Sequence, residues 1–232
     1  MDPMLSDEER LEEIKKWWKT HGMSLVGGLA LGVAIVWGWG YFQDVKKGTK
    51  NSASSEYNVL TSQISTYERT GLLRTKPDKK TESIIQIQSE ELIKKYGDTV
   101  YAVDSSLILA KLAVSKNNLK EAQKRLQWVV SKTDSDSYKH HIGRIRLARV
   151  QRDQKQYAAA LKTLDVTPPS QFSMMYNFIK GTVYERQSQC SQARSAYQIS
   201  IKVMESQEKS KQNQLKDLKQ TIQRRLENVQ NC

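Results

Sequence analysis

The chain has 232 residues, of which 38% are hydrophobic and 27% charged, and a formal net charge of +12. Only one stretch of twenty residues, 23–42, lacks charged side chains altogether, which excludes a protein with several membrane spans. The positive charge favours an acidic protein surface, anionic lipid or nucleic acid. The sequence has neither a block of five like charges nor a recognised nucleic-acid-binding motif, so nucleic acid is not expected as a partner.

Residues 1–22 are predicted to form a short amphipathic leader that lies along the membrane surface. Leu11, Ile14 and Trp18 recur at helical spacing and therefore share one face of a helix. Gly22 is expected to end this helix, because glycine is the most frequent residue just beyond a helix C-terminus.

Residues 23–42 are predicted to cross the membrane as a single helix. At about 1.5 Å per residue the segment spans roughly 30 Å, the thickness of the hydrocarbon core. Trp37, Trp39 and Tyr41 gather at its end, where aromatic rings favour the headgroup layer. A cleaved signal peptide is the alternative, but the acidic leader and the length of the apolar run favour a retained anchor. The flanks carry nearly equal numbers of Lys and Arg, so charge bias does not fix the orientation.

Small residues repeat every four positions within the anchor, at Ser24, Gly28 and Gly32. Such a stripe lets a second membrane helix approach closely, and we interpret it as a candidate helix-pairing face. The alternative is that glycine is simply common in membrane helices.

The remainder is predicted to consist of a linker, residues 43–56, and one helical domain, residues 57–232. This domain is long enough for a substantial core. Its few proline and glycine residues leave long stretches without breakers, whereas strand hairpins would need frequent turn signals. The stretch around Pro77 is expected to be a loop between two helices.

An internal repeat with spacings of 38 and then 33 residues organises this domain. Three sets of positions recur in register: Ala110, Ala148 and Gly181; Ala122, Ala160 and Ala193; and Leu126, Leu164 and Tyr197. Small residues where two antiparallel helices touch, with a large apolar residue beside them, are typical of tetratricopeptide-type hairpins. The fold class predicted is therefore all-α: one transmembrane helix, then a tetratricopeptide-like α-solenoid of three to four helix hairpins.

Both ends of the repeat array have recognisable patterns. A degenerate fourth hairpin is indicated by apolar positions between Tyr57 and Tyr67 and between Ile84 and Tyr96. The last helix shows a second apolar stripe: Leu215, Leu218, Ile222, Leu226 and Val229. We interpret it as the polar-backed capping helix that such arrays need, with a dimerising coiled coil as the alternative.

A family resemblance rests on two runs of the second hairpin, Ile145-Arg-Leu-Ala-Arg-Val-Gln and Gln156-Tyr-Ala-Ala-Ala-Leu-Lys-Thr-Leu-Asp165, and on shorter matches at 116–122 and 192–197. They resemble the bacterial ancillary SecYEG translocon subunit family, whose members join a single N-terminal anchor to a tetratricopeptide-like domain. The resemblance implies an inner-membrane protein with a cytoplasmic N-terminus and periplasmic repeats. It also implies association with the SecYEG protein-export channel and with a membrane-anchored periplasmic chaperone of the prolyl-isomerase type.

Nothing in the sequence supports catalysis, a cofactor or a metal site. The histidines are His21, His140 and His141, and adjacent residues on a helix point about 100° apart, so the last two make a poor metal pair. We expect them to begin a helix near solvent. No phosphate-binding glycine loop, dinucleotide fingerprint or nucleophile motif is present.

A protein partner is expected on the concave side, which the first helices of the hairpins line. Register places Lys111 and Arg149 at equivalent positions there, with Arg152, Met175 and Phe178 nearby. Two cations beside an apolar patch can hold a carboxylate and one hydrophobic side chain. The alternative is that Met175 and Phe178 belong to the core and that the cations are solvated.

The two cysteines suggest a cross-link. Cys190 lies in the turn of the third hairpin and Cys232 ends the sequence. If the chain reverses between them, the last two helices run antiparallel and return Cys232 towards Cys190, where a disulfide can form in the periplasm. If they form one unbroken helix, the sulfur atoms are about 60 Å apart.

The leading hypothesis is a non-enzymatic, membrane-anchored scaffold of the Sec translocon whose periplasmic repeats bind a chaperone or emerging secretory chains. Tethering raises the effective concentration, so weak contacts suffice. An alternative is a cytoplasm-facing adaptor that binds anionic lipid or an acidic regulatory protein. A third is homodimerisation through the anchor or the cap.

Overall fold

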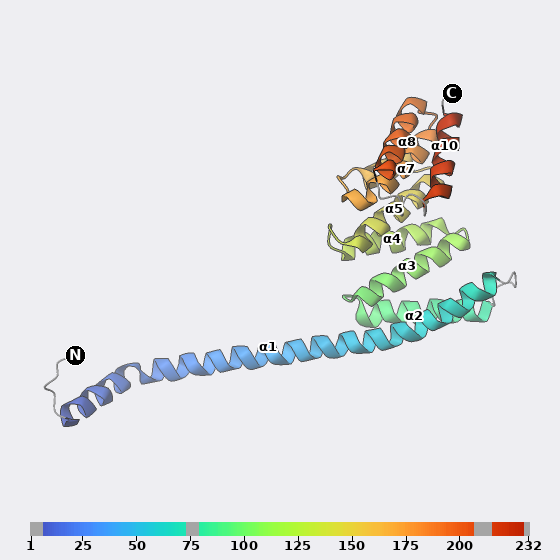
Figure 1. The fold of residues 1–232 in the computed structure, drawn as a ribbon. Helices are drawn as coiled ribbons and strands as arrows, with labels where there is room; N and C mark the ends of the chain where they lie inside the picture. Colours follow the sequence, from blue (N-terminus) through green and yellow to red (C-terminus); the bar gives the residue numbers. More distant parts are fainter. Residues whose placement is uncertain (1–6, 73–78, 207–214, 230–232) are drawn as a thin grey trace. The chain divides into compact units, whose positions relative to one another are not determined.

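The computed structural model describes residues 7–72, 79–206 and 215–229, which are helical apart from short connections and contain no strand. The chain divides into two compact units, Met1–Ser52 and Ala53–Cys232. Helix α1 (Asp7–Leu72) begins in the first unit and ends in the second (Figure 1). The predicted all-α fold class is confirmed.

The first unit is the N-terminal part of α1 and contains the apolar segment. Its large side chains, among them Leu29, Val36 and Trp37, are exposed along the whole segment. Within the described ranges, α1 is the one helix long and apolar enough to cross a membrane. An apolar helix without cover from its own chain is suited to a lipid environment, as predicted for residues 23–42.

The expected end of the leader helix is wrong, because α1 runs without interruption through Gly22 and through residues 43–56. The boundaries of leader, anchor and linker stay predictions. Gly22 does not end the helix. The Trp18 ring lies over it, and a Cβ atom at position 22 would be 3.1 Å from that ring. Glycine here makes room for Trp18 within a continuing helix, and the segment 43–56 contains no proline to break it.

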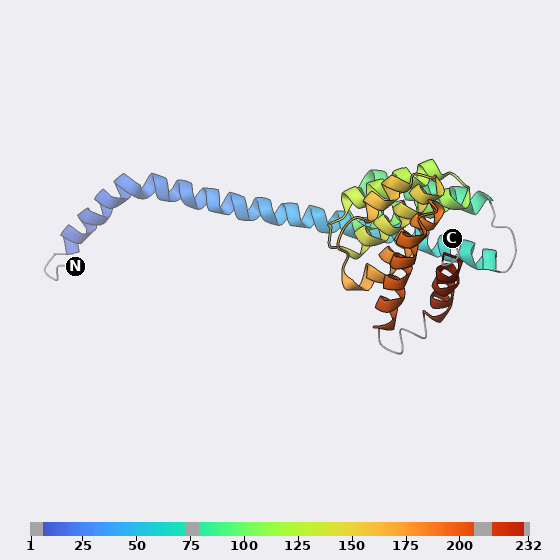
Figure 2. The ribbon, with the colours of Figure 1, turned by 90° about the horizontal axis from the view of Figure 1, so that it is seen from above.

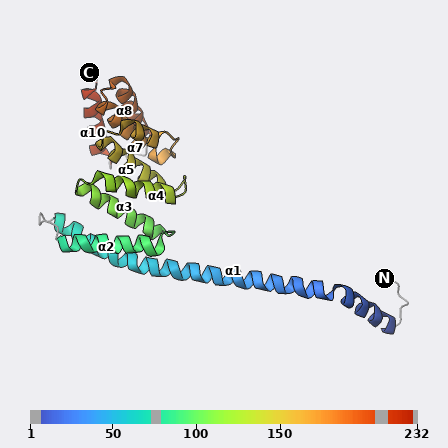
Figure 3. The same ribbon diagram turned by 180° about the vertical axis from the view of Figure 1, so that it is seen from behind.

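The second unit is a stack of antiparallel helix pairs (Figures 1 and 3). The end of α1 packs against α2 (Lys79–Tyr96), and three pairs follow: α3 (Val100–Ser115) with α4 (Leu119–Lys132), α5 (Tyr138–Asp153) with α6 (Tyr157–Leu164), and α7 (Ser170–Arg186) with α8 (Cys190–Glu205). The first helices α3, α5 and α7 contact one another in succession and form one layer. The loop expected around Pro77 lies outside the described residues.

Helix α10 (Lys216–Asn228) lies along α8 (Figure 2) and confirms the predicted cap. Ile222 and Val229 are buried in the cluster formed by α5 to α8, and Leu215, Leu218 and Leu226 pack against it. Because this apolar stripe is covered within the chain, it does not provide the seam of a dimerising coiled coil.

The predicted repeat register is confirmed by burial. The small residues at both helix contacts are buried, and so are Leu126, Leu164 and Tyr197 beside them. The third hairpin has Gly181 and Tyr197 where the first two hairpins have Ala and Leu. The two changes compensate for each other in volume, because a Cβ atom at Gly181 would overlap the Tyr197 ring. A larger residue in the second helix therefore accompanies a smaller one in the first.

The turn inside each hairpin repeats one backbone geometry. Asn117, Lys155 and Ser188 have φ values of 57°, 62° and 57°, and each lies seven residues after the small residue of its first helix. The next amide then donates to a carbonyl five residues earlier in all three turns, at 2.8 to 2.9 Å. None of these left-handed positions is a glycine, so the residue that most often marks such a turn is absent from all three.

Candidate functional site

The two histidines of α5 are buried, which corrects the expectation that they lie near solvent. They do begin the helix, but His140 is 9% and His141 4% exposed. The cause is α7, which covers this face: the Phe172 ring centroid lies 4.8 Å from that of His141, and the Tyr176 hydroxyl is 2.9 Å from His141 Nδ1. Within the described residues, no group of three or more metal-binding side chains occurs.

The environment of His141 favours its neutral form. Burial, followed by the charges of His140 and Arg144, lowers the pKa of His141, against an opposing effect of Asp136. A neutral imidazole whose Nδ1 lies within hydrogen-bond distance of the Tyr176 hydroxyl serves to join α5 to α7. Its role is therefore structural.

The predicted cations Arg149 and Arg152 lie together at the contact between α5 and α7. Arg149 Nη2 donates to Met175 Sδ at 3.4 Å, and Arg152 Nη1 donates to Thr182 Oγ1 at 2.9 Å. Arg152 also pairs with its neighbour Asp153 at 2.8 Å. Three of the five predicted contact residues are thus brought to one place.

The electrostatics of Arg149 are unfavourable. Burial, followed by repulsion from Arg152 and Arg146, lowers the pKa of Arg149, and Asp153 only partly opposes this. The thioether of Met175 is a weak acceptor, whereas a guanidinium has five N–H donors to satisfy. This arrangement concentrates positive charge and leaves donors ready for a further acceptor.

The other two predicted residues are Phe178 and Lys111, and their surroundings differ from those of the two arginines. Phe178 is 8% exposed and packs on Tyr197, with the ring centroids 6.2 Å apart, so it belongs to the core as the alternative interpretation had it. Lys111 is exposed on α3 and lines a small apolar pocket with Ile64 and Tyr67 of α1. Whether either residue acts with Arg149 in binding stays a prediction.

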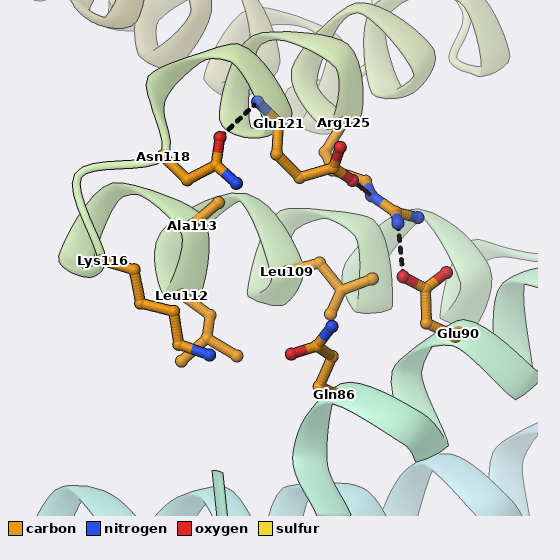
Figure 4. A pocket seen from close by; sticks show the side chains of 9 residues that line it. All are labelled: Gln86, Glu90, Leu109, Leu112, Ala113, Lys116, Asn118, Glu121 and Arg125. Atoms are coloured by element: carbon orange, nitrogen blue, oxygen red, sulfur yellow. Dashed lines mark hydrogen bonds and ion pairs between the residues drawn. The ribbon is translucent and has the colours of Figure 1, made fainter. Parts of the chain in front are cut away.

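Sequence reasoning missed a polar pocket of about 80 Å³ between α2, α3 and α4, shown in Figure 4. Arg125 is its centre: it bonds Glu90 of α2 and, at 2.5 Å, Glu121 of its own helix. Asn118 begins α4 and accepts from the Glu121 amide at 3.2 Å. The cap pair Asn118 and Glu121 and the i,i+4 pair Glu121 and Arg125 were visible in the sequence, but Glu90, 35 residues away from Arg125, was not.

The charges of this pocket satisfy one another. Burial alone would lower the pKa of Arg125, but hydrogen bonds to Glu121 and Glu90 outweigh it and raise the pKa. The pocket is small and its guanidinium is occupied by two carboxylates. It therefore fastens α2 to α4 and is not a candidate for binding a partner.

The predicted helix-pairing face lies in the first unit. Gly28 and Gly32 line a shallow apolar groove with Leu25, Leu29 and Val36, and a Cβ atom built on either glycine would meet no side chain beyond its immediate chain neighbours within 4 Å. Ser24 does not line this groove. Pairing of the anchor through this face stays a prediction.

The predicted disulfide involves one residue that the structure describes. Cys190 begins α8, whereas Cys232 lies outside the described residues. Arg194 Nη2, one turn after Cys190, donates to the Val229 carbonyl at 3.3 Å. The chain therefore returns to the first turn of α8 three residues before Cys232, as the antiparallel alternative requires, and the bridge itself stays a prediction.

Comparisons with known proteins extend over both units. A family model described as a tetratricopeptide repeat-like domain matches residues 15–231. The ancillary SecYEG translocon subunit of Escherichia coli (strain K12) is 29% identical over 85% of this chain and 88% of the relative. Proteins of the same name from Haemophilus influenzae and Neisseria gonorrhoeae are 24% and 25% identical over 77% and 86% of this chain, and over 80% and 90% of their own lengths. The predicted resemblance is confirmed.

Proposed function

The chain belongs to the tetratricopeptide repeat-like family whose model matches nearly all of it, and we propose that it is a non-enzymatic, membrane-anchored scaffold associated with the SecYEG channel. The observation that carries the proposal is the extent of the similarity. Relatives named as ancillary SecYEG translocon subunits match 77% to 86% of the chain, so the likeness extends beyond a few repeats.

The array supports an adaptor role. Stacked hairpins present an extended surface made by the layer of first helices, and such surfaces bind proteins rather than transform substrates. The anchor holds this surface at the membrane, where a raised effective concentration lets weak contacts suffice. We infer that the array faces the periplasm and holds a membrane-anchored chaperone of the prolyl-isomerase type, or an emerging secretory chain, close to the channel.

The experiment that tests orientation uses a C-terminal tag and added protease on intact spheroplasts. Cleavage of the tag, with a cytosolic marker protein intact, is the expected result. Protection until detergent dissolves the membrane would reverse the topology and defeat the export scaffold. A cytoplasm-facing adaptor for anionic lipid, favoured by the net charge of +12, would then take its place.

Association is tested by co-purification of the channel subunits from a detergent extract. A matched variant replaces residues 23–42 with an unrelated membrane helix of equal length. We expect the channel with the wild type, and comparison with the variant shows whether the anchor or the array makes the contact. Absence of the channel from the wild-type extract, with the tagged protein itself recovered, would contradict the proposal.

Homodimerisation is the third hypothesis. The apolar stripe of α10 is covered within the chain, so the anchor is the remaining one of the two predicted dimer interfaces. A mass that rises with concentration in detergent, and that falls to the monomer value when Gly28 and Gly32 are both replaced by Leu, would indicate pairing through the anchor. If the mass of the protein in detergent does not change with concentration, homodimerisation through the anchor is excluded.

A further inference from the structure

The connections from α4 to α5 and from α6 to α7 enclose a pocket at one edge of the array, where the loops that join successive hairpins lie (Figures 1 and 3). The pocket has a volume of about 430 Å³. Its walls include Ser135 and Asp136 before α5, His140 in the first turn of α5, and residues 166–169 before α7. Arg149 and its neighbours do not line it, so this pocket is separate from the cluster at the α5 to α7 contact.

His140 places an unpartnered acceptor in this pocket. The residue is 9% exposed, and its Nδ1 atom is 3.2 Å from the Thr133 carbonyl oxygen. A carbonyl only accepts, so in the neutral ring Nδ1 carries the proton and Nε2 is the acceptor. His140 Nε2 has no hydrogen-bond partner among the described residues and, in contrast to Nε2 of His141, is not enclosed by protein atoms. A side chain that is more than nine-tenths buried thus presents a free lone pair to the pocket.

Asp136 supplies a carboxylate beside this acceptor. It is exposed, forms no ion pair among the residues that the structure describes, and accepts a hydrogen bond from Ser135 Oγ at 3.1 Å. Its charge opposes the lowering of the pKa of His141, which places the carboxylate close to the two histidines. Asp134 and Asp165 lie on the same two connections and are exposed as well. These connections, residues 133–137 and 165–169, contain three aspartates and no basic residue.

The basic side chains around the pocket are engaged elsewhere. Lys132 and Lys139 form ion pairs of 2.9 and 2.6 Å with aspartates near the start of α3. Arg144 lines the pocket, but its Nε donates to the Thr163 carbonyl at 2.8 Å and its guanidinium also bonds the Tyr176 hydroxyl. The carboxylates of the two connections are therefore left without a basic partner within the described part of the chain.

We propose that this pocket binds an arginine side chain of a partner protein. The guanidinium donates to the Asp136 carboxylate and to His140 Nε2, and an apolar residue beside that arginine packs on Val166 and Pro168. The pocket gives the proposed scaffold a partner chemistry, and so the inference rests on the proposed function.

The chemistry of the pocket favours a guanidinium over other cations. A metal ion would need a third ligand, and no group of three metal-binding side chains occurs in the parts of the chain that are described. A guanidinium has five N–H donors in one plane and can reach a carboxylate and an imidazole together, whereas an ammonium is a compact point charge. At about 430 Å³ the pocket is also large enough for more than one side chain, which suits a segment of a protein.

The test uses the full-length protein in nanodiscs of zwitterionic lipid and a fluorescein-labelled ten-residue peptide in which Arg and Leu alternate, with empty nanodiscs as the blank. The protein has a net charge of +12, so a cationic peptide is attracted to it only by a local acidic site. We expect saturable binding, measured by fluorescence anisotropy, that weakens about tenfold in Asp136→Asn. Asp217→Asn removes an exposed carboxylate in the first turn of α10 and should leave the affinity unchanged.

A second variant tests the pocket without changing a charge. Thr167→Trp fills the space between the two connections and should abolish binding, whereas Thr167→Ser should retain it. Asp136 and Thr167 are exposed, so all these variants should unfold at the wild-type temperature. If Asp136→Asn is nevertheless less stable, Thr167→Trp decides alone. Wild-type affinity in Thr167→Trp would place the peptide outside the pocket and would overturn the proposal.

The peptide provides the remaining controls. A Lys and Leu peptide should bind less tightly, because an ammonium does not bridge the two acceptors. The proposal would be overturned by a lack of saturable binding, by equal binding of a peptide with neutral citrulline in place of Arg, or by an equal loss in Asp217→Asn.

Self-association that depends on Asp136 and displaces the peptide would assign the pocket to a second copy of the chain, and it would also overturn the proposal. Peptide binding is scored on purified protein, whereas orientation and channel association are scored in spheroplasts and detergent extracts. The pocket can therefore fail while the scaffold stands.

Discussion

Arg125 and Arg149 are both partly buried arginines of the same array, but their surroundings are opposite. Arg125 joins Glu121 to Glu90 and so fastens α4 to α2, and the two carboxylates raise its pKa in spite of burial. Arg149 meets a thioether and two like charges, and its pKa is lowered. The chain supplies Arg125 with two carboxylate partners, whereas Arg149 has none among the residues that the structure describes.

The C-terminal part of the array contains a second charged residue whose hydrogen bonds join different helices, as those of Arg125 do. Glu185 of α7 accepts from the Tyr197 hydroxyl of α8 and, at 2.8 Å, from Arg225 of α10. Burial, followed by the hydrogen bond to Glu185, raises the pKa of Tyr197, so its hydroxyl stays a donor. The array thus has charged groups with complete partners both before and after α5, around Arg125 and around Glu185. The lack of a carboxylate partner is therefore particular to Arg149 and is not a general property of the array.

The largest expected effect comes from the predicted disulfide between Cys190 and Cys232. Cys190→Ser should lower the free energy of unfolding of the oxidised protein by about 4 kcal/mol, because the bridge closes a loop of some forty residues. Denaturant unfolding measures the loss. Cys232→Ser should cause the same loss, and the double variant no more than either single one.

Thiol labelling provides the control for this prediction. The wild type should react with a maleimide only after reduction, and reduced protein should match the serine variants in stability. Full labelling of both thiols without reductant would show that no bridge exists, and the C-terminal part would then be held by the apolar stripe of α10 and by Glu185 and its partners.

The second largest effect is expected at the contact between Gly181 and Tyr197 in the third hairpin. Gly181→Ala should lower the free energy of unfolding by about 2 kcal/mol, because the added methyl group meets the buried Tyr197 ring. Thermal or urea unfolding measures it. Ala148→Gly, the reverse change at the equivalent position of the second hairpin, should lose about 1 kcal/mol through helix propensity and a further amount through the loss of a buried methyl group.

A double variant makes this prediction sharper. Gly181→Ala with Tyr197→Leu recreates the Ala148 and Leu164 pair, so its loss should be smaller than the sum of the two single losses. Strict additivity would mean that the two positions do not depend on each other.

The hairpins could be predicted because their signal is local and periodic. Ala122, Ala160 and Ala193 recur at the contact between paired helices, and burial follows directly from that geometry. The anchor was predictable for a similar reason, since twenty uncharged residues are a matter of composition. The continuation of the helix through Gly22 was not predictable, because this glycine has a packing role that only the Trp18 ring reveals.

The candidate site was only partly predictable, because its chemistry depends on pairs far apart in the sequence. Register placed Arg149 correctly, but the contact with Met175 joins residues 26 positions apart. Phe178 occupies the same repeat position as Ile145, and both are buried. The repeat alone therefore favours a core role for Phe178 over the predicted partner contact. The burial of His141 depends on Phe172 and Tyr176, which no local pattern around His141 indicates.

A direct comparison of the two arginines gives the third prediction. Arg125→Gln should lower the free energy of unfolding by about 1 kcal/mol, because it leaves Glu90 and Glu121 without their shared partner. The effect is moderate since the Glu90 side chain is 42% exposed and water screens the pair. Urea unfolding at low and high salt measures it, with Arg149→Gln as the matched variant. Equal losses in the two variants would remove the distinction between paired and unpaired arginine.

The smallest effect is a pH dependence that arises next to the Arg149 site, at the α5 to α7 contact. Folding lowers the pKa of His141, so the unfolded chain binds a proton more readily than the folded one. Stability should therefore be complete above the ordinary histidine pKa of about 6.5 and should fall as the pH decreases below it. Urea midpoints at pH 8 and pH 5.5 measure this loss. His141→Gln cannot titrate and should be less stable at pH 8 but less sensitive to acid. If its acid sensitivity equals that of the wild type, carboxylates elsewhere govern the pH dependence, and the contact between α5 and α7 keeps its strength in acid.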